Sequence, residues 1–104
     1  MDNLNKIEEL NELFSLYQEL LTEKQVEYFK MYYHFDYSLQ EIADNFDVSR
    51  NAIYDQIKKT EEHLYNYEEK LKLVELRNKR IELLNKYFET KTIKYLEELR
   101  KLDE

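Results

Sequence analysis

The side chains best suited to recognition chemistry lie in residues 49–60. Arginine and asparagine can form paired hydrogen bonds with base edges, while lysine ammonium and serine hydroxyl groups suit phosphate oxygens. The candidate contacts to nucleic acid are Ser49, Arg50, Asn51, Tyr54, Lys58 and Lys59. The alternative is a solvated helix face with ordinary charge pairs four residues apart, such as Asp55 with Lys59.

Two apolar stripes predict the helices that must position these side chains. Their members are three or four residues apart, the spacing that puts side chains on one face of a helix. The stripes are Leu39, Ile42, Ala43 and Phe46 for a first helix, and Ile53 and Ile57 for a second. The small Ala43 lets the second helix cross closely over the first.

The residues around these stripes predict where the two helices begin and how they are joined. Ser38 and Glu41 form a capping box, and Ser49 suits the N-cap of the second helix. Asp47 occupies the corner position that usually needs a left-handed residue, most often glycine, and aspartate tolerates that conformation. Val48 is expected to fill the angle between the helices. Together these features predict a helix-turn-helix, the alternative being an ordinary hairpin in a helical bundle.

The net charge of −7 argues against a simple nucleic-acid binder, because a basic balance is the usual footprint of one. The charge is uneven along the chain. Residues 1–48 carry three lysines against eleven carboxylates, a net of −8, whereas residues 49–60 carry three cations against one aspartate, a net of +2. Residues 70–86 carry six cations against two glutamates, a net of +4. A secondary basic patch is expected at Lys70, Lys72, Arg77, Lys79 and Arg80.

The remaining sequence predicts an all-α fold, since the 104 residues contain no glycine or proline and no strand-like alternation. A helix is expected over residues 5–20, a second after the capping pair Thr22 and Gln25, and a loop over residues 34–37. The helix over residues 5–20 carries a broad apolar stripe that is expected to be mostly buried, made of Ile7, Leu10, Phe14, Tyr17 and Leu21 and widened by Leu13, Leu16 and Leu20. The second helix of the motif is expected to continue to a break near residues 69–73. Thr90 or Thr92 is expected to cap a last short helix.

The C-terminal part carries two apolar stripes, more than a small domain can easily cover. They are Val74, Ile81, Leu84 and Phe88, and Leu73, Leu76, Leu83 and Tyr87. We therefore expect a head over residues 1–70 and a helical extension over residues 71–104 that forms a dimer or partner surface, within one compact domain overall.

Enzyme, cofactor and membrane functions have no support in the sequence. His34 and His63 lie on different predicted elements without metal-ligand spacing, and there are no cysteines. No nucleophile motif, phosphate loop or paired carboxylates occur in a recognisable context. The ten tyrosines recur at helical spacing and are expected to fill the core and interfaces. No apolar run suits a membrane span or signal core, so a non-enzymatic cytoplasmic protein without cofactor or metal is expected.

Residues 21–25, the aromatic-rich segment after them and residues 38–64 resemble region 4 of bacterial sigma factors. They are still more similar to the YlxM-type family of small helix-turn-helix proteins of Gram-positive bacteria and mollicutes. The similarity covers about residues 10–73, with Asp47 where sigma-type turns usually carry glycine. It implies a four-helix head, a helical C-terminal extension and a regulatory role in the signal recognition particle pathway, whose GTPase gene commonly neighbours the family's gene.

Two functions remain open at this point. One is a regulator that binds DNA or the RNA of the signal recognition particle, which the local basic patches favour. The other is a protein-interaction module that docks onto the particle's GTPase, which the acidic front half favours. A homodimer is expected with either function.

Overall fold

The structure is a computed structural model that describes the backbone of residues 2–103 and the side chains of residues 4–103. Helices and no strands are found in this part of the chain, which confirms the all-α prediction. The chain divides into two compact units, Met1–Lys70 and Leu71–Glu104. Within the described residues, no helix is long and apolar enough to cross a membrane.

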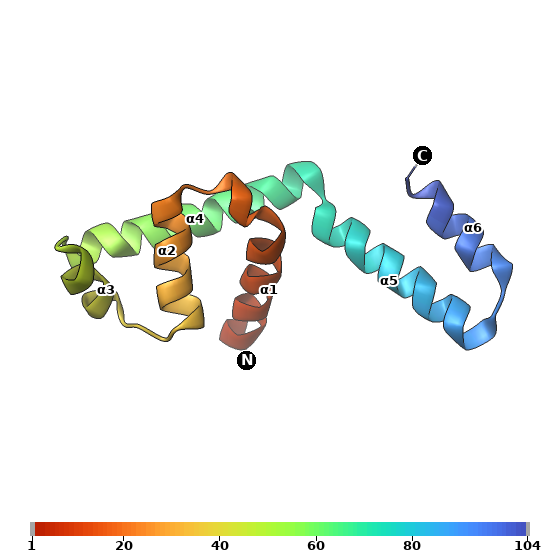
Figure 1. The fold of residues 1–104 in the computed structure, drawn as a ribbon, viewed down its shortest axis with the longest axis horizontal. Helices are drawn as coiled ribbons and strands as arrows, with labels where there is room; N and C mark the ends of the chain where they lie inside the picture. The colour runs from red at the N-terminus through yellow and green to blue at the C-terminus, as the bar shows by residue number, and fades with distance from the viewer. Residues whose placement is uncertain (1, 104) are drawn as a thin grey trace. The chain divides into compact units, whose positions relative to one another are not determined.

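Six α-helices and two short helical segments follow one another along the described chain (Figure 1). They are α1 (Asp2–Tyr17), the 3₁₀ turn η1 (Gln18–Leu20), α2 (Glu23–Phe29), the π-helical turn η2 (Lys30–His34), α3 (Leu39–Phe46), α4 (Arg50–Leu71), α5 (Leu73–Thr90) and α6 (Ile93–Lys101).

Polar caps and left-handed residues replace glycine and proline at the helix ends. The predicted capping box at α2 is present, with the Gln25 amide donating to Thr22 Oγ1 at 3.2 Å. The predicted break after α4 falls at Lys72, which has a positive φ of 54°. Thr92 occupies the N-cap position of α6 but its side chain makes no capping hydrogen bond, so that part of the prediction is wrong. Instead, Thr90 Oγ1 accepts from the Thr92 amide at 3.2 Å.

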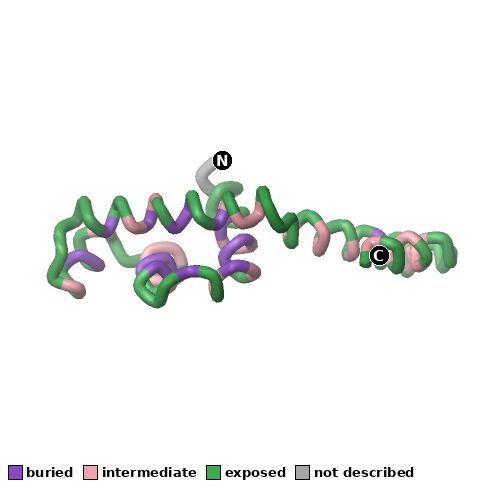
Figure 2. The backbone as a smooth tube through the Cα atoms, turned by 90° about the horizontal axis from the view of Figure 1, so that it is seen from above, coloured by how far each residue is buried: buried purple, intermediate pink, exposed green. Residues whose placement is uncertain are grey.

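In the first unit, α1, α2 and α3 lie along one side of the long helix α4 (Figures 1 and 2). The aromatic rings of Phe14 and Phe29 stack with their centroids 4.2 Å apart, which joins α1 to α2. Leu10 on α1 and Leu64 on α4 are fully buried, so the core continues to the middle of α4. The apolar stripe predicted over residues 5–20 is therefore largely internal.

That stripe is narrower than the sequence predicted. Ile7 near its start is 37% exposed and Leu20 at its end is 52% exposed. Leu20 lies in the 3₁₀ turn η1, whose tighter winding moves residues off the stripe of the preceding α-helix. The predicted loop over residues 34–37 begins one residue later, since His34 ends the π-helical turn.

In the second unit, α5 and α6 pack against each other as a hairpin (Figure 1). Leu83 on α5 is almost fully buried, whereas most residues of this unit are exposed or half-buried (Figure 2). Of the two predicted stripes on α5, the one containing Leu83 is the better covered. Ile81, Leu84 and Phe88 of the other stripe remain exposed, Phe88 by 64%.

Candidate nucleic-acid interface

Helices α3 and α4 are joined by the corner that the sequence predicted. The Glu41 amide donates to Ser38 Oγ at 3.1 Å and the Ser38 amide to Glu41 Oε1 at 3.0 Å, which completes the capping box of α3. The hydrogen bond that the Glu41 carboxylate accepts from the Ser38 amide, followed by its hydrogen bond with the Ser38 side chain, lowers the pKa of Glu41. Asp47 ends α3 with φ 54° and ψ 47°, the left-handed conformation. The Ala52 amide donates to Ser49 Oγ at 3.0 Å, so Ser49 caps α4 as expected.

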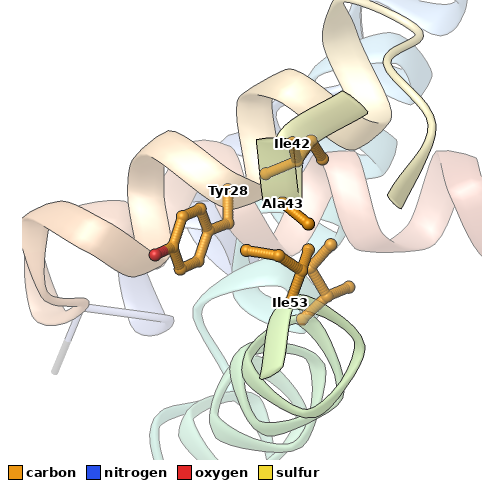
Figure 3. Close-up of a cluster of buried hydrophobic side chains, with 5 residues drawn as sticks. Tyr28, Ile42, Ala43 and Ile53 are labelled. Carbon is orange, nitrogen blue, oxygen red and sulfur yellow. The ribbon is translucent and has the colours of Figure 1, made fainter. Parts of the chain in front are cut away.

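Buried apolar side chains fix the two helices against each other and against α2. Ile42 and Ala43 on α3 meet Ile53 on α4 and Tyr28 on α2, and all four are less than 10% exposed (Figure 3). Val48 is 42% exposed, so the prediction that it fills the corner is wrong. Ala43 and Ile53 already occupy the space between the helices, and Val48 is left at the surface of the turn.

The start of α4 presents its candidate residues to solvent. Ser49, Arg50, Asn51 and Tyr54 are all exposed, and none of them is needed for the core. The first backbone N–H groups of a helix lack intrahelical partners and carry partial positive charge, which favours phosphate. This face can therefore offer a guanidinium, an amide, a phenol and helix N–H groups to one ligand.

The two lysines that follow have different surroundings. Lys59 is exposed, and neither it nor Arg50 forms an ion pair within the described residues. The Lys58 ammonium lies 4.0 Å from Glu61 Oε1 and 5.6 Å from the centroid of the Tyr54 ring. Asp55 and Lys59, given above as an example of a charge pair on a solvated face, form no ion pair among the described contacts, whereas Lys58 and Glu61 do.

The side chain of Glu61, which no sequence pattern indicates, is a buried junction beside this face. It is 7% exposed, and Glu61 Oε2 accepts a hydrogen bond from the Tyr33 hydroxyl at 2.7 Å. Burial and this hydrogen bond raise the pKa of Tyr33 far above its usual range. Glu61 Oε1 lies 3.4 Å from Lys6 Nζ on α1. The junction links α1, η2 and α4, and no spacing in the sequence indicates it because its members are 28 and 55 residues apart in the chain.

Some cations of the secondary basic patch already form ion pairs with carboxylates of the same unit. Lys79 Nζ lies 3.9 Å from Glu82 Oε2, and Arg80 Nη2 lies 2.7 Å from Asp103 Oδ1, while Arg77 is half-buried. Lys70 in the last turn of α4 and Lys72, which directly follows this helix, are exposed. The available positive charge of this patch is therefore concentrated at residues 70–72.

The two histidines are engaged in packing contacts. The His34 ring meets Phe14 edge-on at 5.5 Å, and His34 Nε2 lies 3.0 Å from Asn11 Oδ1. His63 Nδ1 lies 3.5 Å from the side-chain nitrogen Nε2 of Gln25. Within the part of the chain that the structure describes, no group of three or more His, Cys, Asp or Glu residues is arranged to hold a metal ion.

The capped helix α3, the left-handed corner and the exposed start of α4 define a helix-turn-helix protein of the all-α class. The chain belongs to the UPF0122 family, whose model, described as "Putative helix-turn-helix protein, YlxM / p13 like", matches residues 4–103. The YlxM-type family predicted from the sequence is thereby confirmed.

Three relatives illustrate how far the similarity extends. The UPF0122 protein YofM of Lactococcus lactis subsp. lactis is 45% identical over 106 residues, covering 97% of this chain and 96% of the relative. The UPF0122 protein YlxM of Bacillus subtilis is 50% identical over 84 residues, covering 81% of this chain and 76% of the relative. A probable UPF0122 protein of Mycoplasma mycoides is 49% identical over 83 residues, covering 80% and 74%.

Proposed function

We propose that this chain is a non-enzymatic regulatory protein that binds nucleic acid through the start of α4. The observation that carries the proposal is the exposure of Ser49, Arg50, Asn51 and Tyr54 at the beginning of the second helix of a well-formed helix-turn-helix. In this motif the same part of the second helix enters the major groove and its outward side chains contact bases and phosphates.

The distribution of charge supports a contact confined to this face. Arg50 and Lys59 have no ion pair within the described residues, so their charge is available to phosphate. The carboxylates of residues 1–48 repel phosphates elsewhere on the chain, which keeps nonspecific binding weak. Asp55 is exposed near the same face. Its carboxylate would repel phosphate but can accept a hydrogen bond from a donor such as the cytosine amine.

The family resemblance also supports a proposal about the pathway. We propose that the protein acts in the cytoplasm, in the signal recognition particle pathway, and that its nucleic acid is DNA or the particle's RNA.

Titration of labelled ligands tests the binding proposal. A duplex DNA and a folded hairpin of the particle's RNA should be titrated with the full chain at physiological salt. We expect one of them to bind more tightly than about 10⁻⁴ M, the weak end of nonspecific affinity. The double variant Arg50→Ala with Asn51→Ala should weaken binding, whereas Lys24→Ala on α2, whose ammonium lies 4.4 Å from the centroid of the Phe46 ring, should not. Failure of both ligands to bind would reject the proposal.

A second candidate function is docking onto the GTPase of the signal recognition particle without any nucleic acid. The net charge of −8 over residues 1–48 and the exposed apolar stripe on α5 favour this candidate. Co-purification from cells with and without nuclease treatment separates the two functions. GTPase that remains bound after nuclease, together with no affinity for either nucleic acid, would support docking alone.

We also propose that a second copy of the chain covers Ile81, Leu84 and Phe88 on α5. These exposed apolar side chains recur on one helix face, and the same face on a second copy is equally apolar and can pack against it. The protein would then be a homodimer that presents two copies of the α4 face.

A further inference from the structure

A cavity of about 440 Å³ lies beside the start of α4, within the size range of small-molecule sites. Its walls come from α1, from η2 with the loop that follows it, from the first residue of α3 and from α4, all of which belong to the first unit. Ile7, Leu39 and Ile57 supply apolar surface. The polar lining consists of Lys6, Tyr32, Tyr33, Asp36, Lys58 and Glu61, and Tyr54 adds an exposed ring.

Two ammonium groups in this cavity share a single carboxylate oxygen. Lys6 Nζ and Lys58 Nζ lie 3.4 and 4.0 Å from Glu61 Oε1, and the other oxygen of Glu61 accepts from Tyr33. The side chains of the two lysines are 46% and 45% exposed, whereas that of Glu61 is 9% exposed. Each ammonium has three donors, so donors remain for a second anion. Such an anion would gain charge-assisted hydrogen bonds from both lysines.

The same cavity also presents two aromatic rings and a second carboxylate. Tyr32 comes from the π-helical turn and Tyr54 from α4, so their rings reach the cavity from different elements. Asp36 lies on the loop between η2 and α3 with a φ of 62°. The backbone hydrogen bond from the Tyr37 amide to the Met31 carbonyl, at 2.9 Å, holds this loop against η2. The cavity therefore combines surfaces for a planar ring, an acceptor for an N–H group and two donors for an anion.

We propose that this cavity binds a free nucleoside monophosphate whose base carries an exocyclic amine. The phosphate accepts hydrogen bonds from Lys6 and Lys58, the base stacks on Tyr54 and Tyr32, and Asp36 accepts from the amine. The proposal goes beyond nucleic-acid binding and does not depend on it. Because Tyr54 and Lys58 belong both to the cavity and to the candidate interface, a bound nucleotide would compete with nucleic acid at α4.

Nuclear magnetic resonance titration of the ¹⁵N-labelled full chain with AMP tests the proposal. We expect saturable amide shifts at cavity residues of α1, η2 and α4 at concentrations up to about 10 mM, roughly ten times a millimolar dissociation constant. Adenosine, which lacks the anion, and ribose 5-phosphate, which lacks the ring, should each bind at least about tenfold more weakly. UMP should also bind more weakly than AMP, because its base has no exocyclic amine for Asp36.

Variants separate this cavity from a general attraction of anions. Lys6→Ala and Tyr54→Ala should each weaken AMP binding about tenfold or more, whereas Glu61→Gln should strengthen it because the lysines lose their competing carboxylate. Lys24→Ala, which removes a cation of the same unit outside the cavity, should leave the affinity unchanged.

Three results would overturn the proposal. The first is the absence of saturable shifts with AMP, and the second is equal binding of ribose 5-phosphate and AMP. The third is AMP binding that Arg50→Ala abolishes but Lys6→Ala does not, because Arg50 lies outside the cavity. Nucleic-acid titrations with the unliganded protein are measured separately, so failure here is distinguishable from failure of the proposed interface.

Discussion

Replacing Asp47 by glycine should stabilise the corner of the helix-turn-helix, and replacing it by alanine should destabilise it. Asp47 has φ 54° and ψ 47° and is exposed. The left-handed conformation costs a residue with a Cβ atom about 1–2 kcal/mol of free energy. The cost is smaller for aspartate than for alanine, because the short polar side chain of aspartate can form local hydrogen bonds. Glycine has no steric cost in this conformation, but it loses more backbone entropy on folding than alanine does, which costs about 0.5–1 kcal/mol.

The stability difference between the two variants is then about 0.5–1 kcal/mol, which divides into a gain of a few tenths of a kcal/mol for Asp47→Gly and a loss of similar size for Asp47→Ala. In a unit of this size 1 kcal/mol corresponds to about 4–8 °C in the midpoint of thermal unfolding. Both variants remove the same negative charge, so the difference between them isolates the backbone conformation. Circular dichroism during heating measures both midpoints.

An unfolding midpoint below that of the wild type for Asp47→Gly would refute this reasoning and indicate that the aspartate side chain makes a stabilising contact. A midpoint of Asp47→Ala equal to that of Asp47→Gly would refute it as well, since the steric cost of the left-handed conformation would then not exceed the entropy cost of glycine.

Three further expectations concern other parts of the chain. Ser38→Ala removes the cap of α3 and should lower the free energy of unfolding by about 1 kcal/mol in urea, whereas Ser15→Ala, inside α1, should change it much less. Burial and the hydrogen bond to Glu9 raise the pKa of Tyr65 to about 12, so the stability that this tyrosine contributes below pH 10 is lost as the pH rises towards 12. Tyr65→Phe should reduce this loss of stability at high pH by less than about 1 kcal/mol after solvent screening. A variant whose stability depends on pH as that of the wild type does would contradict this. Ile81→Glu should convert the proposed dimer to monomers in light scattering, and a wild type that is already monomeric at tens of micromolar would reject this surface.

The local features of the fold could be predicted because they depend on residues close together in the sequence. The capping boxes at Thr22 and Ser38 and the left-handed Asp47 each follow from side-chain chemistry within three or four residues, and the structure contains all three. The break after α4 was predicted only as a range, because Lys72 takes a positive φ without any of the usual sequence signals.

The features that the sequence did not indicate depend on contacts between distant elements. The junction at Glu61 joins side chains from α1 and η2, and the charge pattern of α4 alone makes this glutamate look like part of a solvated face. The exposure of Val48 and Ile7 likewise depends on how neighbouring helices fill the core, which helical periodicity does not specify.

The candidate site at the start of α4 depends partly on residues close together in the sequence and partly on contacts between distant elements. Its residue types and their place at the start of a capped helix could be predicted, and the structure leaves Arg50 and Asn51 exposed there. The position of the Lys58 ammonium near Glu61 could not be predicted, since it depends on the packing of α4 against α1 and η2.

The salt dependence of nucleic-acid binding tests the central claim most directly. Contacts from Arg50, Lys58 and Lys59 imply a slope of about −3 in a plot of log affinity against log salt for duplex DNA, reaching about −5 if Lys70 and Lys72 also contact phosphates. Arg50→Ala with Lys59→Ala should flatten the slope by about two, and Lys24→Ala should leave it unchanged. A slope near zero, or one that the double variant does not alter, would contradict binding through the start of α4.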